Sequence, residues 1–130
     1  MMETAALLVT ALLFGGMVLY AFGFAAFVFS ALPAELAGPT IRRAFPHFYL
    51  FVMAVSGLAA LLLISIDPLS AAVLAVILLS TIPTRQILMP AINAASDSGN
   101  KRRFKLLHSL SVLVTVGHIL GSAFILARFL

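Results

Sequence analysis

The residues best suited to chemistry lie near the C-terminus of this sequence, three or four positions apart. On a helix, at about 100° per residue, they fall within about 80° of one another and form a single polar stripe. Such a stripe can line a path for a ligand, a proton or a metal ion, or it can hydrogen-bond to neighbouring helices. We favour hydrogen bonding, because Ser and Thr commonly bond helices together in membranes. The stripe consists of His108, Ser111, Thr115, His118 and Ser122.

The two histidines of the stripe are candidate cofactor ligands. A buried neutral imidazole binds haem iron or copper well. His108 and His118 are separated by about 15 Å along a helix, so they cannot share one metal ion. Met17, Met53 and Met89 are isolated rather than clustered, which favours packing over a copper path. A haem or copper site at His108 or His118 is therefore the alternative interpretation.

A second polar group surrounds a turn in the third quarter of the chain. Arg85 and Asp97 flank this turn, and Asn93 lies within it. An unpaired charge near lipid is costly, so we expect a carboxylate to hold Arg85, Asp97 first and Glu35 second. The simpler interpretation is that Arg85 reaches out to water at the membrane surface.

The composition indicates lipid as the solvent of these groups. The 130 residues are 63% hydrophobic and only 9% charged, whereas a soluble domain carries about 25% charged residues. The absence of cysteine excludes disulfides and thiolate metal sites. The net charge of +4 comes from residues beside hydrophobic segments, so we do not expect nucleic-acid binding.

Long apolar segments then predict the fold. A helix of about 20 apolar residues crosses a bilayer, and no segment alternates with the period of a strand. We predict one all-α domain, an integral membrane four-helix bundle with spans at about 4–32, 45–66, 68–89 and 104–126. Pro33 and Asp67-Pro68 mark breaks, and we expect Pro83 to kink the third span. The first segment lacks a basic start and is too long for a cleaved leader, so we expect it to be retained.

Positive charge predicts the orientation. Four spans place the first and third loops on one side, with seven of the eight basic residues, and leave Arg128 on the other. Basic loops face the cytoplasm, so we expect both termini on the non-cytoplasmic side, in the bacterial inner membrane. Four of the seven follow one another closely and should bind anionic lipid headgroups. These four are Lys101, Arg102, Arg103 and Lys105, and the other three are Arg42, Arg43 and Arg85.

Two small residues predict close helix packing. Gly117 and Gly121 form a GxxxG pair, which lets helices approach closely in lipid. The partner is either the first span, which also contains glycines, or a second protomer. The second choice would make the protein a homo-oligomer.

A motif between Thr84 and Ser111 resembles a known family. It has an Arg, a Met-Pro-x-Ile-Asn run, an Asp, and then a basic-Phe-x-x-x-His-x-x-Ser helix start. This pattern is similar to the transmembrane-protein-205-like family, and the resemblance extends over nearly the whole chain. The matching residues are Arg85, Met89, Pro90, Ile92, Asn93, Asp97, Arg103, Phe104, His108 and Ser111.

That resemblance implies a small four-span membrane protein whose domain has no known function. It also implies roles in tolerance to toxic compounds, and more remotely a likeness to copper-resistance-D-like and haem-handling membrane proteins. The chain departs from the family in lacking Trp and in having His47 where an aromatic is usual.

No Ser-His-Asp order, paired catalytic carboxylates, phosphate loop or dinucleotide motif occurs in the sequence. We therefore expect a non-enzymatic membrane protein, a transport-related, tolerance or assembly factor. A haem- or metal-binding redox protein is the alternative.

Overall fold

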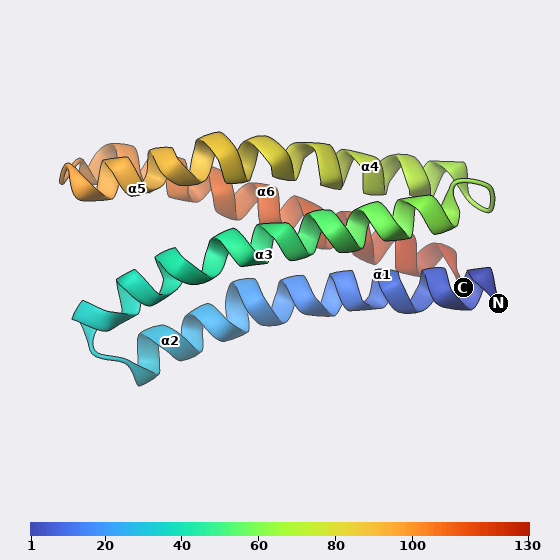
Figure 1. The fold of residues 1–130 in the computed structure, drawn as a ribbon, viewed down its shortest axis with the longest axis horizontal. Helices are drawn as coiled ribbons and strands as arrows, with labels where there is room; N and C mark the ends of the chain where they lie inside the picture. The colour runs from blue at the N-terminus through green and yellow to red at the C-terminus, as the bar shows by residue number, and fades with distance from the viewer.

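The computed structural model describes residues 1–130 and consists of four long helices with no strand (Figure 1). Each helix is long and apolar enough to cross a membrane. This confirms the predicted all-α class and the membrane character of the chain. The helices run antiparallel to their neighbours in the chain, so both termini lie at the same end of the molecule (Figure 1).

Two of the four helices contain a π-helical segment. The first helix consists of α1 (Met2–Val18), the π-helical η1 (Leu19–Phe24) and α2 (Ala25–Ala31). The third consists of α4 (Pro68–Pro83), the π-helical η2 (Thr84–Leu88) and α5 (Met89–Asp97). The second and fourth are the uninterrupted α3 (Ala34–Leu63) and α6 (Lys101–Arg128).

The second and third helices are longer than predicted. Helix α3 begins at Ala34 rather than near residue 45 and contains Pro39 and Pro46. The third helix runs on to Asp97 rather than ending near residue 89, and Pro90 stands in its last segment. Proline alone did not end these helices, because membrane helices satisfy the freed backbone groups through neighbours and local π turns.

Three local signals end or begin the helices. The Asp67 carboxylate caps α4 by accepting a hydrogen bond from the Ser70 backbone N–H at 3.3 Å. The Asn100 side chain caps α6 by accepting one from the Arg103 N–H at 3.1 Å. Between α5 and α6, Gly99 adopts a φ of 71°, which favours glycine. These caps place the turns that the four-span topology requires.

The outer surface of the bundle is apolar. Only 23 of the 130 residues are buried, while Leu61, Ile87 and Leu113 are 71%, 69% and 68% exposed. A soluble protein would hide such side chains from water, whereas in lipid they need no burial. The exposure thus belongs to a protein surrounded by acyl chains.

The core lies mainly where all four helices meet. Its largest members come from each helix and include Leu13, Phe48, Leu74 and Ile125. Tyr20 closes one side of this core, donating a hydrogen bond to the Ala44 carbonyl at 2.8 Å. Its ring also lies 5.1 Å from that of Phe48. Aromatic packing and this bond fix the first helix against α3.

The two ends of the bundle differ in how closely the helices pack. At the end with both termini and the turn at residues 64–67, the helices lie close together; we call this the closed end (Figure 1). Toward the turns at 32–33 and 98–100, the open end, the helices part into two arms (Figure 1). Helices α2 and α3 pack together in one arm, and α5 and α6 in the other.

Candidate ligand-binding cleft

A cleft of about 670 Å³ lies between the two arms. This volume is in the range that holds a drug-sized ligand. Its lining includes five aromatic side chains, those of Phe22, Phe29, Phe45, Tyr49 and Phe104. It also includes seven polar side chains, those of Arg42, Asn93, Ser96, Asp97, His108, Ser111 and Thr115. The cleft therefore offers apolar and polar surface to the same occupant.

The π-helical segments lie where the arms begin to part. Segments η1 and η2 each start between about four and five turns into their helices, counted from the closed end. A π turn inserts an extra residue and redirects the helix beyond it, and such turns are frequent at functional sites. Pro83, where we expected a kink, immediately precedes η2. No comparable sequence signal marks η1.

One ion pair crosses the mouth of the cleft. The Arg42 guanidinium of α3 donates to both Asp97 carboxylate oxygens of α5, at 2.9 and 3.3 Å. The two side chains remain 41% and 64% exposed. This is the only hydrogen-bonded contact between the side chains of the two arms. Its geometry is typical of bidentate Arg–carboxylate pairs.

The expected pairing of Arg85 is wrong. Its Nε donates to the Pro46 carbonyl at 3.2 Å and a terminal nitrogen to Gln86 Oε1 at 3.1 Å. Asp97 is twelve residues further along the same helix, about 18 Å away, so Arg42 reaches it instead. Glu35 is exposed and forms no ion pair. Arg85 thus links η2 to α3.

The hydroxyl residues of the polar stripe face the bundle. Ser111, Thr115 and Ser122 are 7%, 8% and 0% exposed. Ser111 and Thr115 contribute to the inner wall of the cleft, whereas Ser122 lies nearer the closed end. Ser111 and Ser122 donate to carbonyls three residues back on their own helix, at 2.7 and 2.8 Å. The hydroxyl groups of Ser111 and Ser122 therefore face the bundle, and each already donates its hydrogen bond to its own helix.

The two histidines of the stripe occupy different surroundings. The His118 Nε2 lies 2.7 Å from the Ser80 hydroxyl of α4. Tyr20 and Ser56 do not bond this ring, because Tyr20 donates to the Ala44 carbonyl and Ser56 to a carbonyl of its own helix. His108 is exposed in the cleft wall and stacks on Phe104, with ring centroids 5.5 Å apart.

No group of three or more His, Cys, Asp or Glu side chains gathers to hold a metal ion. His108 lies in the cleft wall against Phe104, whereas His118 lies against Ser80 of α4, so the two imidazoles are not neighbours. Because haem iron needs only one or two axial ligands, the alternative of a cofactor at His108 or His118 stays a prediction.

The GxxxG pair does not act as a pair within the chain. A Cβ on Gly121 would meet Val73 and Ile77 of α4 at 3.4 and 3.5 Å, while one on Gly117 would meet nothing within 4 Å. Within the chain, Gly121 therefore packs against the third helix and not against the first span. Gly117 is exposed on the outer face.

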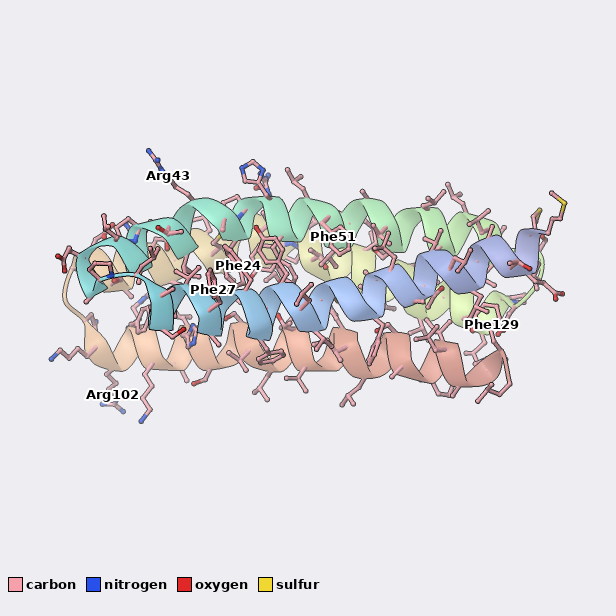
Figure 2. All side chains as sticks on the ribbon, turned by 90° about the horizontal axis from the view of Figure 1, so that it is seen from below. Phe24, Phe27, Arg43, Phe51, Arg102 and Phe129 are labelled. Carbon is pink, nitrogen blue, oxygen red and sulfur yellow. The ribbon has the colours of Figure 1, made fainter.

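A second, purely apolar groove lies on the outer face of the first helix. It has a volume of about 590 Å³ and includes Gly16, Phe24, Phe27 and Phe51. Figure 2 shows the three phenylalanines near one another, with Arg43 and Arg102 pointing outward at the open end. This groove has no polar wall to orient a ligand, and its apolar lining is suited to contact with acyl chains.

One family matches this chain over residues 8–101: the domain of unknown function DUF4149. The matched region includes the first three helices and the turn that leads to α6, and thus most of the cleft wall. Neither a curated protein nor a solved structure matches the chain.

Proposed function

We propose that this chain, which belongs to the family of the domain of unknown function DUF4149, is a non-enzymatic membrane protein that holds an amphipathic ligand in the cleft between its arms. The observation that carries the proposal is the cleft itself, which combines five aromatic rings with seven polar side chains. An amphipathic molecule fits such a mixed lining, because its apolar body and its polar head must both be satisfied.

The position of the cleft favours a ligand that arrives from the bilayer. Each helix has 28 to 30 residues, about 42 to 45 Å, against a hydrocarbon thickness of about 30 Å. The excess must lie in the headgroup region. We place it at the open end, where six of the eight basic residues lie within ten residues of a turn, while Arg85 lies about 18 Å further along its helix.

The same basic residues support an orientation. We propose that the open end faces the cytoplasm and that both termini lie outside it, in the bacterial inner membrane. Lys101, Arg102, Arg103 and Lys105 are exposed at the start of α6 and would contact anionic headgroups there.

A role as a transport-related, tolerance or assembly factor agrees with ligand capture at the membrane surface. The transmembrane-protein-205-like motif at Arg85, Asn93, Asp97 and His108 supports this role, because three of these four residues contribute to the cleft. A homo-oligomer through the outward-facing Gly117 stays a prediction.

Blocking the cleft tests the proposal. Ser111→Phe would fill its inner wall, and Leu113→Phe, at a 68% exposed position on the same helix outside the cleft, is the matched control. We expect lipids or other amphiphiles to copurify with the wild type and the control and to be lost from Ser111→Phe, by mass spectrometry. Equal retention in all three folded proteins would contradict the proposal.

A labelling experiment avoids a bulky substitution. The chain has no cysteine, so Ser96→Cys would place one thiol in the cleft and Leu106→Cys one on the outer surface. An amphiphile in the cleft should slow labelling of the first thiol only. Reporter fusions after Asp67 and Asp97 test the orientation; a cytoplasmic signal at Asp67 would overturn it.

A further inference from the structure

The cleft contains one basic and one acidic residue, and they are bonded to each other. Arg42 and Asp97 are the only Arg, Lys, Asp or Glu residues in its wall. They come from opposite arms, and both side chains are accessible at its mouth. Lys and Arg residues elsewhere at the open end lie outside the wall. The cleft thus has balanced charge although the surface around it is basic.

This ion pair can open at little cost. Exposed pairs contribute about 0 to 1 kcal/mol, because water and salt compete with them. Neither residue has another hydrogen-bond partner: Arg42 contacts only Asp97, and Asp97 only Arg42. A ligand that satisfied both groups could replace the contact without leaving either charge unpaired.

The two groups select complementary chemistry. A guanidinium binds phosphate through two parallel N–H donors. A carboxylate accepts hydrogen bonds from a primary ammonium. A phosphate alone would satisfy Arg42 and leave Asp97 without its cation, while a cation alone would leave Arg42 without its anion. Only a head that carries both charges completes the exchange.

The two charged groups are close enough for one such head to reach both, since the Arg42 guanidinium and the Asp97 carboxylate lie 2.9 Å apart. In an aminophospholipid the phosphate is next to the glycerol and the ammonium lies beyond it. With the acyl chains in the cleft, these adjacent phosphate and ammonium groups could bind Arg42 and Asp97 together.

Aromatic side chains complete the site. Phe22 of η1 and Phe29 of α2 come from the first helix, and Phe104 comes from α6 in the opposite arm. They offer apolar surface on both sides of a chain that enters between the arms. His108, stacked on Phe104, adds a ring nitrogen in the same wall.

We infer that the cleft is a binding site for a zwitterionic aminophospholipid, whose phosphate replaces Asp97 on Arg42 and whose ammonium replaces Arg42 on Asp97. This inference rests on the proposed function, which requires only an amphipathic ligand.

Headgroup selectivity tests the inference. Purified protein is mixed with phosphatidylethanolamine or phosphatidylglycerol of identical acyl chains, and bound lipid is measured by native mass spectrometry. We expect phosphatidylethanolamine to bind about tenfold more tightly, the value of one hydrogen bond to a charged group. Equal binding, or preference for phosphatidylglycerol, would overturn the inference.

Variants assign the selectivity to the two residues. Asp97→Asn should remove the preference for phosphatidylethanolamine while phosphatidylglycerol still binds, and Arg42→Gln should weaken both lipids. Arg43→Gln, next in sequence but outside the cleft wall, is the control and should behave like the wild type. An unchanged preference in folded Asp97→Asn would contradict the assignment.

Two further experiments distinguish the ways in which the inference could fail. Free phosphoethanolamine, which has the head but no chains, should not compete; competition would assign the site to a soluble zwitterion instead. If Ser111→Phe releases no lipid, the proposed function fails as well. If Ser111→Phe releases lipid but the wild type has no headgroup preference, only the zwitterion assignment fails.

Discussion

The two ends of the bundle each have one Arg–carboxylate pair, but the pairs differ in their surroundings. At the closed end, Arg128 of α6 donates to both oxygens of Asp67 at 2.8 and 3.0 Å, and Ser70 donates its hydroxyl to the same carboxylate at 2.6 Å. The Arg128 guanidinium also lies 5.7 Å from the Phe124 ring. At the open end, Arg42 and Asp97 have only each other.

Exposure follows the same division. The side chains of Asp67 and Asp97 are 23% and 64% exposed. The hydrogen bonds from Arg128 and Ser70 hold the pKa of the Asp67 carboxyl well below its usual range. A carboxylate with several fixed partners stabilises a closed structure, whereas one with a single exposed partner can exchange it for a ligand. The same pair of residue types thus stabilises the closed end and remains available to a ligand at the open end.

The largest effect should come from filling the tight contact near the closed end. Gly121→Leu would push its side chain into Val73 and Ile77, both branched residues of α4. Overpacking of this kind costs about 1 to 3 kcal/mol. We expect a clear fall in the thermal midpoint in detergent, measured by circular dichroism. Gly117→Leu, with open space around it, is the control; an equal loss there would contradict this packing.

A smaller effect should come from the closed-end ion pair. Asp67→Asn removes both the α4 cap and the partner of Arg128, so we expect a lower thermal midpoint at neutral pH. Asp97→Asn is the matched control at the open end and should change the midpoint less. Equal midpoints for the two variants would remove the distinction between the ends.

Acid should erase the difference between wild type and Asp67→Asn. The folded-state pKa of Asp67 is lowered from its ordinary value of 3.8. Its contribution to stability is therefore complete above that value and is lost as the pH falls through the lower folded pKa. Thermal midpoints of the two proteins should converge as the pH falls below the ordinary value. A gap that widens in acid would contradict the pairing.

The smallest effect should come from the bond between His118 and Ser80. Hydrogen bonds between membrane helices contribute about 0.6 kcal/mol on average. His118→Ala and Ser80→Ala should each lower stability slightly, and the double variant should lose less than the two separate losses combined. Strict additivity would show that the 2.7 Å contact contributes nothing. His108→Ala, on the exposed cleft wall, should leave stability unchanged.

Much of the fold could be predicted from composition alone. Apolar segments of membrane-spanning length required helices, since no other open structure satisfies its backbone in lipid. The break at Asp67-Pro68 could also be predicted, because proline fits the first turn of a helix and aspartate caps it. Ser111, Thr115 and Ser122 are buried because the helical period puts them on one face, and a polar face is unfavourable in contact with lipid. The same reasoning identified the cleft residues His108 and Asn93 as polar candidates without locating the cleft.

Partners across the bundle were decided only by the tertiary structure. Arg42 and Arg85 are the same residue type near the same end, and the sequence does not tell which one faces Asp97. That choice depends on the length of α3, on the π turn at η2 and on the 18 Å of helix between Arg85 and Asp97, about 1.5 Å for each residue. Likewise, Ser80 meets His118 because α4 packs beside α6. Helical periodicity determines which face of its helix a residue occupies. Which residue of another helix it contacts depends on how the helices bend and pack.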